Sequence, residues 1–252
     1  ETAAAKFFAN SGTYKDSALY RELYGKARYW EAKNQLIKAR LYHRLTTDIN
    51  FKYLYTSLEN APNEWARAQL YTTMGNNPIF LDSLTSLYAR ETNQTAKTYC
   101  LEAICNLIIK FDKSLDNERH LIYKFKKGRV IDKIIDALFI EDGFSAYTAA
   151  SKLQSPVFNM QSSQNLIPQI DSLLKVWTLP VYYETHVELQ KLKMAIMDQK
   201  LDDFHLDMPF NNPIDWDFGK TIPKDQKLKI TTEKGEIVIE LDVENAPGTV
   251  GY

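Results

Sequence analysis

Two short stretches of this sequence gather residue types that bind metal ions. They are DDFHLD, with Asp202, Asp203, His205 and Asp207, and ETHVE, with Glu184, His186 and Glu188. Carboxylate oxygens and imidazole nitrogens are common metal ligands. The first stretch lacks the glycine and the ordered spacing of a calcium loop, and His186 and Glu188 face different ways when two residues apart on a helix. The sequence therefore assigns no metal ligand.

The two cysteines, Cys100 and Cys105, lie in an apolar run that predicts a helix. A spacing of five residues turns them about 140° apart around the helix, so they should not bridge each other. A metal site would need more His or Cys nearby, and we expect both thiols to be buried as small apolar groups. No Gly-rich phosphate loop, nucleophile elbow or paired-carboxylate motif stands out, so the sequence predicts no catalytic or cofactor-binding residue.

The stretch YKFKKGR, Tyr123 to Arg129, mixes four basic residues with two aromatic ones. Such a mixture could contact a nucleic acid through phosphates and stacked bases. We favour a helix C-terminus, with lysines near the last carbonyl groups and Gly128 as the cap. Lys plus Arg number 31 against 32 Asp plus Glu, a net charge of −1, so no overall field draws the chain to nucleic acid.

From Thr2 to about Gln199 the pattern predicts one short helix after another, with Gly and Pro mostly at the joints. Small residues stand beside large apolar ones at spacings of three and four, which places them on one helix face. These groups are Ala32, Leu36 and Ala39; Trp65, Ala68 and Tyr71; Ala96, Cys100, Ala103 and Leu107; and Tyr147, Ala150 and Leu153. Because small residues let helices approach closely, we expect a mostly α fold of stacked helices.

Comparable small positions recur along this region at irregular intervals. They are Ala5, Ala32, Ala68, Ala96 and Ala149, with gaps of 27, 36, 28 and 53 residues. The pattern resembles HEAT-like α-solenoid repeats, and a non-repeating helical bundle is the alternative.

The widest gap holds the stretch RVIDKIIDALFI, whose broad apolar stripe fits full burial. The stripe consists of Val130, Ile131, Ile134, Ile135, Leu138 and Phe139. Turn residues mark joints at Asn76, Asn77 and Pro78, at Asp116 and Asn117, and at Pro156 and Pro168.

The composition changes after Gln199, where prolines, Asp and Asn replace the helical period. We therefore divide the chain into a helical-repeat domain, 1–200, a linker or extended arm, 201–226, and a terminal segment, 227–252. The arm carries four large apolar side chains, Phe204, Phe210, Trp216 and Phe218. These are costly to leave in water, so we expect part of the arm to dock on the helices.

The terminal segment begins with KLKITTEKGEIVIEL, in which apolar and polar residues alternate on both sides of EKG. This pattern predicts a β-hairpin with one apolar face. Gly235 can adopt positive φ at the turn, and Lys and Glu side chains can pair across the strands. An isolated hairpin is marginal in water, so we expect it to be poorly ordered, to dock on the helices or to pair with another molecule.

The stretch TTEKGEIVIELDVENAPGTV, from Thr231 to Val250, resembles the opening of a cyclophilin-type peptidylprolyl isomerase domain. In that family an Ala-Pro-x-Thr element begins the first helix of an eight-stranded β-barrel. The resemblance covers about 20 of 252 residues, and Gly251 and Tyr252 stand where the family usually has Asn-Phe. Helical repeats before such a domain also resemble a multidomain bacterial arrangement.

The resemblance implies a catalytic Arg in a Phe-x-Arg motif, a Gln-Gly-Gly stretch and an aromatic proline pocket, and none of these maps onto this sequence. We therefore expect this chain to be catalytically incomplete, as the protein-binding helical region of a cyclophilin-type isomerase that acts in protein folding. The alternative is a stand-alone HEAT-like scaffold or binding module without enzymatic activity.

Partners follow from the same features. Stacked helices present long surfaces, so we expect a protein or peptide partner, and the exposed hairpin could support self-association. No run approaches the roughly 20 apolar residues of a membrane span. We expect no nucleic acid partner and no cofactor. The sequence assigns no compartment, and the resemblance leaves the cell envelope or periplasm open for the whole protein.

Overall fold

The computed structural model describes residues 3, 17–42, 48–200, 204, 206 and 216–245. The chain divides into two compact units, Glu1–Leu206 and Asp207–Tyr252. The first unit is helical, and the second contains a short helix and a two-stranded sheet. The expected mostly α fold is confirmed. The small-residue position Ala5, Phe210 and residues 246–250 of the ENAPGTV stretch lie outside the described residues.

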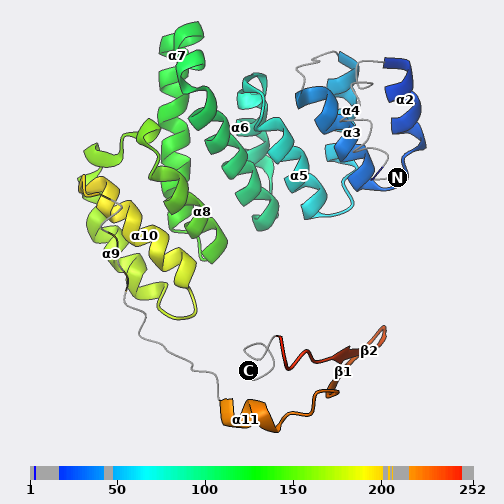
Figure 1. The fold of residues 1–252 in the computed structure, drawn as a ribbon. Helices are drawn as coiled ribbons and strands as arrows, with labels where there is room; N and C mark the ends of the chain where they lie inside the picture. The colour runs from blue at the N-terminus through cyan, green and yellow to red at the C-terminus, as the bar shows by residue number, and fades with distance from the viewer. Residues whose placement is uncertain are drawn as a thin grey trace. The chain divides into compact units, whose positions relative to one another are not determined.

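Consecutive helices of the first unit run from blue to yellow in Figure 1. They are α2 (Ser17–Lys26), α3 (Trp30–Tyr42), α4 (Asp48–Glu59), α5 (Glu64–Met74), α6 (Leu81–Arg90), α7 (Gln94–Leu138), α8 (Gly143–Leu153), α9 (Ile167–Val176) and α10 (Tyr183–Ile196). Short 3-10 turns fill the joints: η2 (Pro78–Phe80), η3 (Pro156–Phe158), η4 (Met160–Ser162) and η5 (Gln164–Leu166).

Helix α7 folds back on itself. In a straight helix, residues 112 and 127 would lie about 22 Å apart, at 1.5 Å per residue. Instead, the Nζ of Lys127 and the hydroxyl of Tyr123 each donate a hydrogen bond of 2.7 Å to the Asp112 carboxylate. The helical backbone must therefore reverse between these residues, which is where Asp116 and Asn117 predicted a joint. We call the parts before and after the reversal the first and second limbs of α7.

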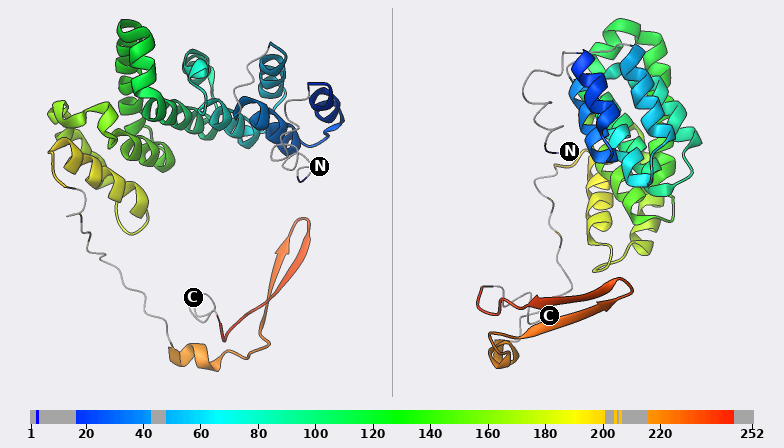
Figure 2. Two further views of the ribbon diagram at one scale, coloured as in Figure 1. Left: turned by 45° about the horizontal axis from the view of Figure 1, so that its top comes forward. Right: turned by 90° about the vertical axis from the view of Figure 1, so that its right-hand side faces the viewer.

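With α7 divided in this way, the unit becomes a series of antiparallel helix pairs. The pairs are α2 with α3, α4 with α5, α6 with the first limb of α7, the second limb with α8, and α9 with α10. The second member of each pair packs on the second member of the next, from α3 through α5, α7 and α8 to α10. Figures 1 and 2 show this succession. We call these second members the stacked helices.

Small residues do line the contacts between the stacked helices. Ala32, Ala68, Ala96 and Ala149 are all buried. At Gly75, which caps α5, an added Cβ would lie 2.8 Å from the carbonyl oxygen of Ala103 on α7. This approach of backbones explains why small side chains recur along the array.

Two aromatic side chains that we expected on the buried faces are exposed instead. Trp65 is 52% exposed and Tyr147 is 36% exposed, whereas their companions Ala68 and Leu153 are buried. In α5 the buried face follows Ala66, Leu70 and Met74, so Trp65 lies beside the stripe rather than in it. A spacing of three residues does not by itself show whether a side chain lies within the buried stripe, as Ala68 does, or beside it, as Trp65 does.

The interpretation of Gly128 as a helix cap is wrong. The second limb of α7 continues through Gly128 to Leu138, and Val130, Ile134 and Leu138 form its buried stripe. These apolar residues hold the helix in place beyond the glycine, which itself has open space around it. Phe139, at the end of the same run, is 42% exposed and so departs from the expected full burial.

The second unit contains the expected hairpin. Strands β1 (Lys227–Thr232) and β2 (Gly235–Glu240) pair antiparallel, with Leu228 opposite Ile239 and Ile230 opposite Ile237. Gly235 has φ +136 at the turn, and Lys229 pairs with Glu236 at 2.6 Å. Each residue of both strands is exposed, including these four apolar side chains.

The arm contains a short helix that the sequence did not predict, α11 (Trp216–Thr221), where Lys220 pairs with Asp217 at 3.1 Å. Trp216 and Phe218 on α11 are each 54% exposed. The expected docking of the arm on the helices stays a prediction. Phe204, in the first unit, is half-buried, and the Nζ of Lys191 lies 5.6 Å from its ring centroid.

Candidate protein-binding site

Aromatic side chains from three stacked helices form a row. Trp65 of α5 lies 6.1 Å from Tyr99 of α7, and Tyr99 lies 5.3 Å from Phe144 of α8, measured between ring centroids. We call these three residues the aromatic row. Trp65 and Phe144 are 52% and 37% exposed, so the row is accessible to a partner.

Matching N-terminal caps begin the three helices. Asn63, Asn93 and Asp142 each precede a stacked helix and accept a hydrogen bond from the backbone N–H three residues on. These side chains satisfy N–H groups that the helix itself leaves unpaired. Each cap begins its helix two to six residues before the aromatic row, so the caps fix where the ring positions fall.

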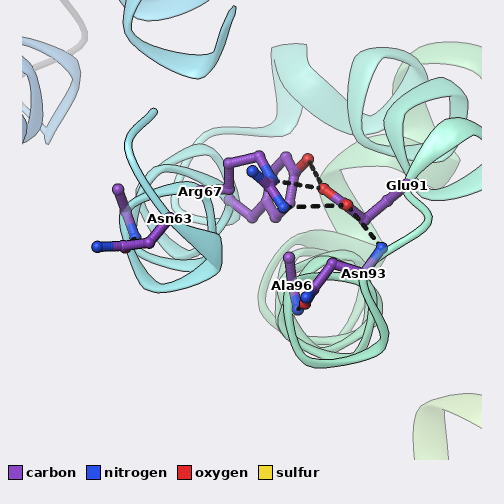
Figure 3. A network of polar contacts seen from close by, with 7 residues as sticks. Asn63, Arg67, Glu91, Asn93 and Ala96 are labelled. Carbon is purple, nitrogen blue, oxygen red and sulfur yellow. Dashed lines mark hydrogen bonds and ion pairs between the residues drawn. The ribbon is translucent and has the colours of Figure 1, made fainter. Parts of the chain in front are cut away.

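A polar network at Glu91 joins α5 to the start of α7 (Figure 3). The Glu91 carboxylate accepts hydrogen bonds from the Tyr71 hydroxyl at 2.7 Å, the Arg67 Nε at 3.0 Å and the Asn93 backbone N–H at 3.0 Å. The Glu91 side chain is only 7% exposed. This network ties the helix that carries Trp65 to the helix that carries Tyr99.

The network also changes the acidity of its members. Burial alone would raise the pKa of Glu91, but the hydrogen bonds from Tyr71 and Asn93 and the nearby Arg67 guanidinium lower it below the usual range. Burial, followed by the hydrogen bond to Glu91, raises the pKa of Tyr71. Glu91 is therefore ionised and Tyr71 is a neutral donor at ordinary pH.

A cavity of about 340 Å³ lies between the first two helix pairs. Its lining comes from the end of α2, the start of α3, the end of α4 and the turn before α5, and includes Tyr24, Lys33, Ser57, Asn60 and Pro62. The Tyr24 hydroxyl and Ser57 Oγ are hydrogen-bonded at 2.6 Å, and Lys33 Nζ lies 5.6 Å from the Tyr24 ring centroid. The cavity is thus mixed in character, with aromatic, amide and cationic groups.

The two cysteines are free and buried, as expected. The Cys100 thiol donates to the Leu84 carbonyl oxygen at 3.5 Å. Burial raises the pKa of Cys100 and raises that of Cys105 to about 12. Neither thiol forms the thiolate that nucleophilic chemistry requires.

Two of the ETHVE candidates, His186 and Glu188, are hydrogen-bonded within the first unit, and Glu184 is exposed. His186 Nδ1 bonds the Trp177 carbonyl oxygen at 2.8 Å, and Glu188 accepts from Gln154 and Lys191. Over the residues that the structure describes, no group of three or more His, Cys, Asp or Glu could hold a metal ion. Asp202, Asp203, His205 and Asp207 of the other stretch lie outside those residues.

The basic stretch YKFKKGR joins helices to one another. Lys127 pairs with Asp112 of the first limb, and Lys126 pairs with Asp82 of α6. The guanidinium of Arg129 lies 5.7 Å from the Phe125 ring centroid. These contacts give three of the four basic residues an intramolecular role.

Neither the aromatic row nor the cavity was predicted from the sequence. The usable signal for the row was the Asn-Glu-Trp and Asp-Gly-Phe openings at Asn63 and Asp142, which put an aromatic residue two positions after each cap. The cavity had no such signal, because its residues come from four elements. None of the described helices is long and apolar enough to cross a membrane.

Comparisons of this chain with protein-family models, with curated protein sequences and with solved structures found no match.

Proposed function

We propose that this chain is the protein-binding helical region of a cyclophilin-type peptidylprolyl isomerase, followed by the opening of its catalytic domain. The observation that carries the proposal is the hairpin of β1 and β2. Its register places Leu228, Ile230 and their partners on one face, all exposed among the described residues. An apolar sheet face of this kind is stable when further structure covers it, which is the place a β-barrel core would fill.

The chemistry explains why the hairpin alone would be inactive. Rotation about a peptide bond faces a barrier of about 18 to 20 kcal/mol. In the family, an Arg donates a hydrogen bond near the prolyl nitrogen of the twisted substrate, and an apolar pocket holds the ring. We match neither group to a residue of this chain, so the activity belongs to the whole protein.

The helical unit would supply binding. The aromatic row offers exposed rings on an array of packed helices, and large aromatic residues dominate the energetics of many protein interfaces. An unfolded or extended segment held there would be kept near a catalytic domain. This supports a role in protein folding more directly than the rival role, that of a stand-alone scaffold.

The decisive experiment is to sequence the native reading frame through Tyr252 and to assay the encoded protein. We expect Phe-x-Arg and Gln-Gly-Gly to follow, and the longer protein to accelerate cis–trans exchange of a prolyl peptide measured by NMR. The present chain should show no acceleration. A reading frame that stops at Tyr252 would remove the isomerase proposal and leave the scaffold.

Binding by the row is tested with a reduced, carboxymethylated protein as an unfolded probe. Replacing both Trp65 and Phe144 by Ala should weaken its binding by about tenfold or more, as expected for interface aromatics. Phe125→Ala is the matched control, because Phe125 is 68% exposed and lies outside the row. Equal losses in both variants would count against the row.

A further inference from the structure

The cavity between the first two helix pairs has a one-sided charge. Arg28 and Lys33 are among its lining residues, and no Asp or Glu is among the described residues that line it. Glu31 and Glu59 stand next to lining residues in the sequence, and Glu64 stands two residues from Pro62, yet none of them lines the cavity. Lys33 therefore brings a positive charge to a described lining that contains no carboxylate, in a chain whose net charge is −1.

The uncharged lining suits a peptide. Asn34 and Asn60 supply amide groups, and Thr56 and Ser57 supply hydroxyl groups that can bond a peptide backbone. The Asn34 side chain is held in place, because the residue is 4% exposed and its Nδ2 donates to the Ala66 carbonyl oxygen at 3.4 Å.

Aromatic and proline surfaces complete the lining. Tyr29, Trp30 and Pro62 contribute to the cavity, and Tyr29 is 63% exposed. At about 340 Å³, the volume lies at the lower end of the range of about 300 to 1,000 Å³ typical of ligand sites. That space admits one or two side chains rather than a folded surface.

We propose that this cavity binds an acidic peptide segment, in which a carboxylate side chain meets Lys33 and a neighbouring apolar side chain packs against Tyr29 and Trp30. The proposal rests on the proposed protein-binding function and gives it a partner chemistry. A carboxylate accepts charge-assisted hydrogen bonds from an ammonium group, and an apolar neighbour adds area that a free anion lacks. Because Lys33 lies over the Tyr24 ring, its ammonium group is positioned before the ligand arrives.

The test titrates the full chain with acetyl-Ala-Phe-Glu-Ala-amide and follows backbone amide shifts by NMR. We expect shifts confined to the cavity lining, and about tenfold weaker binding when Gln replaces Glu in the peptide, equivalent to about 1.4 kcal/mol. A peptide with Lys in that position should not bind. Equal affinities for the Glu and Gln peptides would overturn the proposal.

Variants of the protein provide a second test of the proposal. Lys33→Glu should abolish binding, Lys33→Gln should weaken it about tenfold, and Lys33→Arg should restore most of it. Lys38→Glu is the matched control, since Lys38 is exposed on the same helix and is not a lining residue. An unchanged far-UV circular dichroism spectrum confirms that each variant is folded. Equal losses for Lys33→Glu and Lys38→Glu would overturn the proposal, because they would indicate only general charge attraction.

Two further probes separate other ligands. Acetate should bind at least about tenfold more weakly than the peptide, because it lacks the apolar group. The second probe is a thymidine hexanucleotide. If it bound more strongly than the peptide, and if Lys33→Glu abolished that binding, the ligand of the cavity would be a nucleic acid and the proposal would be overturned. If the cavity does not bind an acidic peptide, the results of the reading-frame test and of the Trp65 and Phe144 test are unaffected. The proposal for the cavity and the proposed function can therefore be rejected independently.

Discussion

The Glu91 carboxylate illustrates how this fold uses a charged residue at a joint. It accepts hydrogen bonds from two α5 side chains and from the backbone of the α7 cap. A carboxylate can accept from all three donors at once, whereas an amide of the same shape presents only one acceptor oxygen. The network therefore depends on the charge and not only on the shape of Glu91.

We expect Glu91→Gln to lower the free energy of unfolding by about 1 to 3 kcal/mol at pH 7, because a donor amide would face buried donors. The pKa of Glu91 is lower in the folded protein than its usual value of about 4.3. Its stabilisation is therefore present above that value and is lost as the pH falls through the lower folded pKa. Urea unfolding at pH 7 and in steps toward acid pH measures both effects.

The control for this prediction is Glu59→Gln, at the exposed end of α4. Its effect should stay within about 0.5 kcal/mol. A difference between the native protein and Glu91→Gln that persisted unchanged to the most acid pH at which both fold would contradict the lowered pKa.

At the scale of elements, the fold-back of α7 decides how the array continues. The second limb becomes the first helix of the next pair. Because the two limbs of α7 together span 45 residues, the gap from Ala96 to Ala149 is the widest in the repeat. Lys97 of the first limb and Lys133 of the second both lie over the Tyr88 ring, at 5.2 and 5.6 Å. The two limbs and α6 therefore form one local packing unit.

Gly128 provides a test of the continuous second limb. Gly128→Ala should raise the free energy of unfolding by about 0.5 to 1 kcal/mol, because Ala replaces Gly inside an exposed helix and nothing lies within 4 Å of the added methyl group. Chemical denaturation measures the change. If Gly128 were a left-handed cap, the same change would destabilise the protein.

The contrasting variant is Gly75→Ala, where the new Cβ would meet the Ala103 backbone at 2.8 Å. This change should destabilise the protein, since backbone atoms cannot move aside as a flexible side chain can. A lower free energy of unfolding for Gly75→Ala and a higher one for Gly128→Ala would show that close helix approach determines the effect at Gly75 and helix propensity the effect at Gly128.

At the scale of the whole molecule, the two compact units predict independent stability. Removing the residues after Leu206 should leave the thermal midpoint of the helical unit within about 2 °C of its original value. Circular dichroism at 222 nm follows the helices during heating. A loss of several degrees would show instead that the second unit is integral to the stability of the helical array.

Local pattern was sufficient for several elements of the molecule. The helix joint at Asn77 and Pro78, the buried cysteines and the hairpin all follow from neighbouring residues. The same reasoning failed at Trp65 and Tyr147, because helical spacing gives a face but not the angle at which a neighbour covers it. It also failed at Gly128, where a buried apolar stripe carries the helix past a residue with poor propensity.

The sequence by itself determined the mostly α character, the positions of most joints and the hairpin, because periodicity and turn chemistry act between residues close in the chain. Only the tertiary structure decided that Lys127 meets Asp112, that Glu91 collects donors from α5 and the α7 cap, and which rings form the aromatic row. These features join residues from different helices, so they depend on how whole helices pack, and no local pattern specifies that geometry.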